Sequence, residues 1–221
     1  ALAARAPTAH GARVATVLGV VAPWLSQPAV LVTAGVALTL LVVEWRREPG
    51  GPRRRVTMTV GAWLLSAAAV VVVSEDHLAP AARRFMTLFW GDGFWPMSFH
   101  GAAIVTWPFL RVASTLGTQL SLPRGMALAG AVLVVLGAWS AWRRDRTTAA
   151  LLVAPLLVTL GASAARLYPF SERLVLFLLP SLLLLMAQGV AALAAAIRPR
   201  GVALAFATAA TILFVALGAR A

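Results

Sequence analysis

Long apolar runs separated by short clusters of arginine dominate the chain. A helix needs about 20 mainly apolar residues to cross a bilayer, and six runs approach or exceed that length. We expect membrane helices at about 29–45, 56–74, 126–142, 147–165, 174–197 and 202–218. The first run begins earlier, at Val14, where Pro23 and Pro28 predict a kink or a short half-helix before the membrane helix. Pro180 predicts a kink in the fifth.

The longest connection, 75–125, has the least regular pattern. Its segment 98–120 is apolar enough to suggest a seventh span, but it contains Pro108 and Arg111. An arginine at the bilayer centre costs about 3 kcal/mol on insertion scales. We therefore expect an amphipathic helix on the outer leaflet, with a re-entrant hairpin as the alternative. The predicted fold is all-α: a single polytopic membrane helix bundle over 1–221, with an external helical loop.

The arginines predict the orientation of this bundle. All 19 basic residues are arginine, and ten of them lie in three short connections between the predicted spans. These are Arg46, Arg47, Arg53, Arg54 and Arg55, then Arg143, Arg144 and Arg146, then Arg198 and Arg200. Short arginine-rich loops stay in the cytoplasm, so we expect both termini and the long loop to lie outside.

Composition narrows the class of protein. The chain is 61% hydrophobic and only 12% charged, with a net charge of +12 and no cysteine. A soluble domain carries about a quarter charged residues, and a nucleic-acid binder clusters its basic residues on a hydrophilic surface. We therefore expect a lipid bilayer and no nucleic acid as partner. The alanine-rich, lysine-free composition is typical of a high-GC bacterium, which indicates the bacterial cytoplasmic (inner) membrane.

The strongest chemical signal is the turn between the fourth and fifth predicted spans, with the sequence RLYPFSER at 166–173. Arg166, Arg173 and Tyr168, the only tyrosine, come together there at the depth of lipid phosphates. The planar guanidinium of arginine matches phosphate oxygens, so these side chains are candidate ligands of a lipid phosphate. The alternative is that the arginines only end the helices and reach the headgroups, with Glu172 neutralising one of them.

Acidic residues offer a second set of candidates. Glu75, Asp76 and His77 follow the second predicted span directly. Carboxylates beside a histidine suit acid–base chemistry or a divalent metal, which is the one cofactor that these residues suggest. The alternative is a solvated helix end. Asp92 lies between two glycines and is either a turn residue or a contact to a sugar acceptor.

The run YPFSERLVLFLLPSLLLLMAQGV at 168–190 resembles the C-terminal membrane region of bacterial GT-C superfamily glycosyltransferases. These enzymes are relatives of the dolichyl-phosphate-mannose protein mannosyltransferases and include glycosyltransferase family 39. The matching residues are Tyr168-Pro169, Arg173, Phe177 and Pro180, and the loop FWGDGFWP at 89–96 resembles the external segment of the family. The likeness extends over the chain from about Val56.

The resemblance implies transfer of a sugar from a polyprenyl-phosphate donor to an acceptor at the outer membrane face. It implies that Arg173, Tyr168 and Arg166 contact the phosphate. The family carries its catalytic acid in an earlier external loop, and nothing before Val14 supplies one, so we expect the chain to be roughly the last half of such a protein. The alternative function is a non-catalytic scaffold or a transporter subunit. The spans have no ionisable residue in their interiors, which weakens the transporter alternative.

Overall fold

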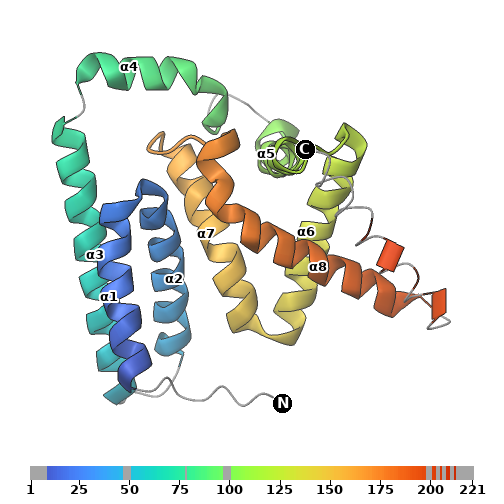
Figure 1. The fold of residues 1–221 in the computed structure, drawn as a ribbon, viewed down its shortest axis with the longest axis horizontal. Helices are drawn as coiled ribbons and strands as arrows, with labels where there is room; N and C mark the ends of the chain where they lie inside the picture. The colour runs from blue at the N-terminus through green and yellow to red at the C-terminus, as the bar shows by residue number, and fades with distance from the viewer. Residues whose placement is uncertain are drawn as a thin grey trace. The chain divides into compact units, whose positions relative to one another are not determined.

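The computed structural model describes residues 9–46, 51–77, 79–96 and 101–197, together with residues 201, 202, 205, 208, 209 and 212. All regular structure in these residues is helical, which confirms the predicted all-α fold (Figure 1). The elements are α1 (Ala9–Leu25), α2 (Gln27–Trp45), α3 (Gly51–His77), α4 (Pro80–Phe89), the 3-10 turn η1 (Gly91–Gly93), α5 (Ala102–Gln119), α6 (Arg124–Arg144), α7 (Arg146–Ala164), the 3-10 segment η2 (Glu172–Leu178) and α8 (Leu179–Ala196).

Five helical segments of the described chain are long and apolar enough to cross a membrane. They are Gln27–Trp45, Arg53–Ser74, Arg124–Arg144, Arg146–Ala164 and Arg173–Ala196. Their bounds lie within a few residues of the first five predicted spans, and they indicate a multi-pass membrane protein. The sixth predicted span, 202–218, lies largely outside the described residues.

The described chain forms two compact units, one ending at Phe85 and the other beginning at Met86. In the first unit, α1, α2 and α3 run alternately up and down beside one another (Figure 1). Of the two alternatives predicted before the first membrane helix, the kink is wrong. A separate helix is present there, but α1 has 17 residues rather than the length of a short half-helix, and it runs antiparallel to α2. Ser26 is extended between them, and Pro28, which has no N–H to donate, lies in the first turn of α2.

Close approach and hydrogen bonds join α1 to α3. A side chain on Gly19 would overlap the indole ring of Trp63, so only glycine leaves room for that ring. The indole Nε1 of Trp63 donates to the Thr16 carbonyl at 3.1 Å, and the Ser66 hydroxyl donates to the Val20 carbonyl at 2.6 Å. Small residues and interhelical hydrogen bonds of this kind associate helices in lipid, where the hydrophobic effect between helices is absent.

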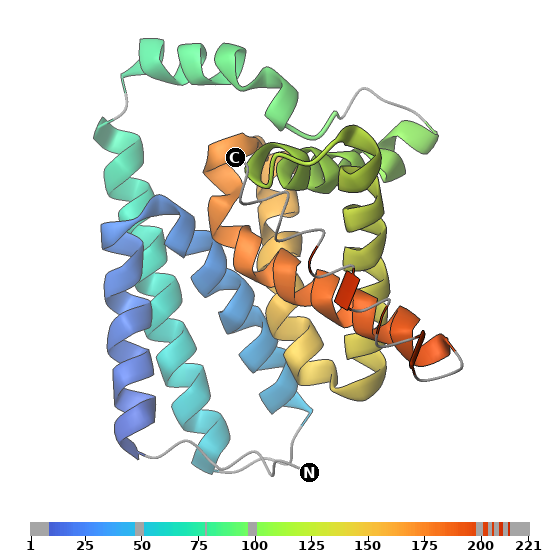
Figure 2. The ribbon, with the colours of Figure 1, turned by 45° about the vertical axis from the view of Figure 1, so that its right-hand side comes forward.

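The second unit is built on the crossing of α6 and α8. A Cβ on Gly137 would collide with the carbonyl oxygen of Leu185, and one on Gly189 with that of Leu133. Helix α5 runs crosswise to α6 and α7 at one end of this unit (Figure 2). It is one continuous helix from Ala102 to Gln119 rather than a re-entrant hairpin.

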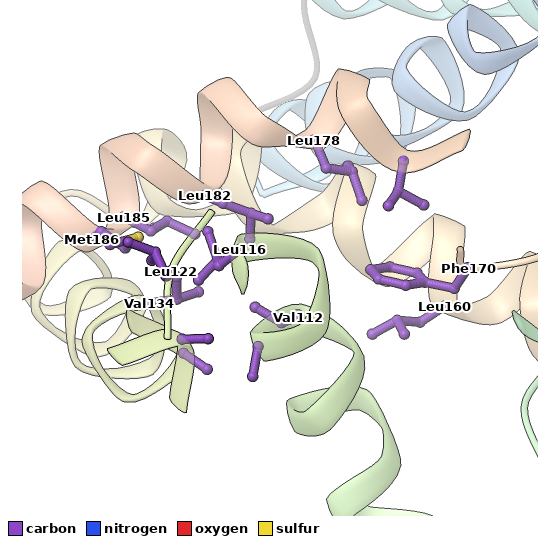
Figure 3. Close-up of a cluster of buried hydrophobic side chains, with 14 residues drawn as sticks. Val112, Leu116, Leu122, Val134, Leu160, Phe170, Leu178, Leu182, Leu185 and Met186 are labelled. Carbon is purple, nitrogen blue, oxygen red and sulfur yellow. The ribbon is translucent and has the colours of Figure 1, made fainter. Parts of the chain in front are cut away.

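One face of α5 is part of the core of the second unit. This core gathers side chains from α5, α6, α7, η2 and α8 (Figure 3). It includes Val112, Leu116, Val134, Leu160, Phe170, Leu178, Leu182, Leu185 and Met186. A kink is predicted at Pro180, within the fifth span. In the structure the segment instead changes from a 3-10 helix to an α-helix: η2 ends at Leu178, and Pro180 lies in the first turn of α8.

Candidate functional site

The site begins at the C-terminal end of α7. The Leu167 N–H donates to the Ala162 carbonyl at 2.9 Å, and the Arg166 N–H donates to the Ser163 carbonyl at 3.1 Å. This pair of bonds is a Schellman motif, which needs a left-handed residue and usually has glycine there. Arg166 takes this position with φ of 57°. The left-handed conformation costs an L-residue about 1–2 kcal/mol, so arginine at this position lowers the stability of the fold by a measurable amount.

The same turn is tied to the aromatic loop at 91–95. The buried Ser163 hydroxyl donates to the Gly93 carbonyl at 2.9 Å and accepts the Trp95 N–H at 3.1 Å. The Phe170 N–H donates to the same Gly93 carbonyl at 2.7 Å. A Cβ on Gly93 would lie 2.9 Å from the Cβ of Pro169, so the close approach requires glycine. We call these three hydrogen bonds the Ser163–Gly93 latch.

Aromatic rings extend the latch to α5. The ring centroids of Trp95 and Trp107 are 5.4 Å apart, and those of Trp107 and Phe170 are 6.4 Å apart. The Arg111 guanidinium lies 5.4 Å from the Trp107 ring centroid and donates to the Asp92 carbonyl. Asp92 itself lies in η1 and is exposed, which fits its interpretation as a turn residue.

Tyr168 faces inward within the turn. Its hydroxyl donates to the Leu174 carbonyl at 2.7 Å, and its ring meets that of Phe177 edge-on at 6.4 Å. Burial raises the pKa of Tyr168 to about 12, because the anionic phenolate loses solvation there. The hydroxyl therefore stays protonated at neutral pH, and its proton is used to join the turn to η2.

Arg166 and Arg173 are the exposed cations of the turn. Neither guanidinium makes a hydrogen bond or an ion pair with the residues that the structure describes. The side chain of Glu172, predicted to neutralise one of them, lies outside the described residues. Within the described site, the predicted phosphate ligands thus divide into two surface cations and one inward-facing tyrosine.

The acidic candidates in the last turn of α3 form a separate group in the first unit. Asp76 is exposed, and the Nδ1 atom of His77 lies 2.7 Å from the Val73 carbonyl of its own helix. The side chain of Glu75 lies outside the described residues. Over the described chain, no three histidine, aspartate or glutamate side chains lie close enough together to hold a metal ion.

Two contributors to the site, Ser163 and Arg111, carried no functional signal in the sequence. Ser163 lies near the end of an apolar run, and it is separated from its partner Gly93 by 70 residues. In the sequence, Arg111 indicated only that the segment 98–120 does not cross the membrane. The glycines of the GDG run at 91–93 were the one local sign that a close backbone approach occurs there.

Comparison of the chain with protein-family models, with curated proteins and with solved structures finds no match in any of the three.

Proposed function

We propose that the turn at 166–173 binds the phosphate group of a lipid at the membrane interface. The observation that carries this proposal is Arg166, which occupies a left-handed position that glycine would fill without steric cost. Strained residues of this kind cluster at ligand and active sites. Arg173 supplies a second exposed guanidinium in the same turn.

The finer proposal is that this phosphate belongs to a polyprenyl-phosphate-linked sugar. The chain would then be a portion of a GT-C-type glycosyltransferase in the bacterial cytoplasmic membrane. Support comes from the Ser163–Gly93 latch, because it joins the two motifs that carry the resemblance, the loop at 89–96 and the Tyr168-Pro169 turn. The guanidiniums would stabilise the departing phosphate as sugar transfer proceeds. Tyr168 would position the turn through its bond to Leu174.

The proposed orientation follows the arginines. The ends of the spans that carry Arg53–Arg55 and Arg143–Arg146 would face the cytoplasm, and the turn at 166–173 would face outward. Helix α1 changes the expectation for the N-terminus. Because α1 runs antiparallel to α2, its first residues lie at the same end of the unit as the end of α2 (Figure 1). We propose that this end, too, is cytoplasmic.

A binding experiment tests the phosphate proposal. The chain in lipid nanodiscs is titrated with a long-chain polyprenyl phosphate and with the matching polyprenol. We expect the phosphate to bind more tightly, and Arg166→Gln and Arg173→Gln each to weaken its binding roughly 10-fold or more, as for the loss of a charged hydrogen bond. Arg124→Gln is the matched control, since Arg124 is an exposed arginine of the same unit outside the turn. Equal binding by wild type and both variants would remove the role of the turn.

The second candidate function is a non-catalytic scaffold or transporter subunit. It is favoured by the hydroxyls of Tyr168 and Ser163, which both bond to backbone: Tyr168 joins the turn to η2, and Ser163 holds the loop at 91–95. The same titration separates the two functions. A scaffold would bind polyprenyl phosphate and polyprenol equally, whereas the transferase portion would discriminate between them.

A further inference from the structure

Helix α4 (Pro80–Phe89) carries an exposed apolar face, of which only Phe89 belongs to a motif named above. Phe85, Leu88 and Phe89 are exposed by 63%, 76% and 64%. Residues spaced by three and four lie on one side of a helix, so these side chains form a single stripe. Three large apolar side chains gathered in this way on a helix of 10 residues are typical of a membrane or protein contact.

Polar residues of α4 lie beside and opposite this stripe. Thr87 lies two residues after Phe85, on the opposite side of the helix, and is exposed. Arg84 is also exposed and lies four residues before Leu88, at the edge of the apolar stripe. An arginine at this edge can lay its methylene groups along the apolar side and extend its guanidinium to a phosphate.

The position of α4 along the chain favours a membrane. It starts three residues after α3, whose apolar segment Arg53–Ser74 is long enough to cross a bilayer. Helix α3 has 27 residues, or about 40 Å at 1.5 Å per residue, whereas the hydrocarbon core is about 30 Å thick. The polar residues Asp76 and His77 lie between this segment and α4, so α4 begins at the depth of the headgroups.

We propose that α4 is an interfacial anchor that lies in the plane of the bilayer surface and binds anionic phospholipid. Phe85, Leu88 and Phe89 insert among the upper acyl chains, and Arg84 contacts lipid phosphates. This is the arrangement of an interfacial amphipathic helix. The anchor is independent of the proposed phosphate site at 166–173, because it uses other residues and another ligand, the bulk lipid.

The absence of cysteine allows a direct depth measurement on the whole chain. Single variants Leu88→Cys and Thr87→Cys are spin-labelled and reconstituted in vesicles of phosphatidylcholine with phosphatidylglycerol. Collision rates with oxygen, which concentrates in lipid, and with a water-soluble nickel chelate then report depth. We expect the label at 88 to favour oxygen and the label at 87 to favour nickel, with a several-fold difference in the ratio.

Two results would overturn the anchor. Equal nickel accessibility of both labels would place α4 in water, and low accessibility of the label at 88 to both reagents would place that face against protein. The lipid preference has its own test. We expect the label at 88 to lie deeper with phosphatidylglycerol present than in pure phosphatidylcholine, and Arg84→Gln to abolish that difference while Arg124→Gln preserves it. A depth that does not change with lipid charge would refute the preference for anionic lipid.

Discussion

Replacing Arg166 by glycine tests whether the arginine at this position lowers the unfolding free energy of the chain. The substitution removes the Cβ from a residue with φ of 57° and keeps the backbone bonds that end α7. Among the described residues, the guanidinium has no hydrogen-bond or ion-pair partner that the substitution would remove. The left-handed conformation costs about 1–2 kcal/mol for an L-residue, and the greater freedom of glycine in the unfolded chain offsets about 0.5–1 kcal/mol of this. We therefore expect Arg166→Gly to raise the unfolding free energy by up to about 1.5 kcal/mol, and by about 0.75 kcal/mol at the middle of both ranges.

The assay is reversible unfolding of the purified chain in mixed micelles by a denaturing detergent, followed by circular dichroism. Ser121 provides a matched control, because it is exposed and has φ of 49° in the turn between α5 and α6. Ser121→Gly is expected to stabilise the chain by a similar amount. Only Arg166→Gly is expected to weaken the binding of polyprenyl phosphate.

Two outcomes would refute this reasoning. If Arg166→Gly lowers the unfolding free energy while Ser121→Gly raises it, the guanidinium stabilises the fold and the strain argument is wrong. If Arg166→Gly stabilises the chain and leaves lipid binding unchanged, the arginine only ends α7.

Further predictions address packing, the latch and pH. Gly137→Ala is expected to destabilise the chain by about 1–3 kcal/mol, because its methyl group would collide with the backbone carbonyl of Leu185 and force overpacking. Gly161→Ala, with open space around it, should not destabilise the chain in the same unfolding assay. Ser163→Ala is expected to cost about 1–3 kcal/mol, since the half-buried N–H of Trp95 loses its acceptor; an unchanged unfolding midpoint would contradict the latch. Tyr168, the only tyrosine, has its pKa raised to about 12 in the fold. Its protonated hydroxyl therefore contributes fully to the stability of the fold below about pH 10, and this contribution is lost as the pH rises to about 12. Absorbance titration at alkaline pH should show that midpoint, and a midpoint near the ordinary tyrosine value would mean that the ring is solvated.

Some parts of the fold were predictable because they depend on local composition. The first five spans followed from the length of the apolar runs, which the bilayer thickness sets without reference to any other part of the chain. The proline predictions were less successful. Pro28 and Pro180 both lie at helix starts rather than at kinks, because a residue that cannot donate is tolerated in a first turn. Only the packing of neighbouring helices decides between a kink and a new helix.

The sequence by itself also determined which residue types are available at the turn after α7: two arginines and one tyrosine at 166–173. The tertiary structure decided what each of them does. In the folded chain the Tyr168 hydroxyl donates to the Leu174 carbonyl, and Arg166 and Arg173 are exposed. Ser163, at the end of α7, binds the Gly93 carbonyl. The physical reason is the separation of the interacting residues along the chain. The length of an apolar run is a property of one segment, whereas the hydrogen bond between Ser163 and Gly93, 70 residues apart, forms only when several helices have packed.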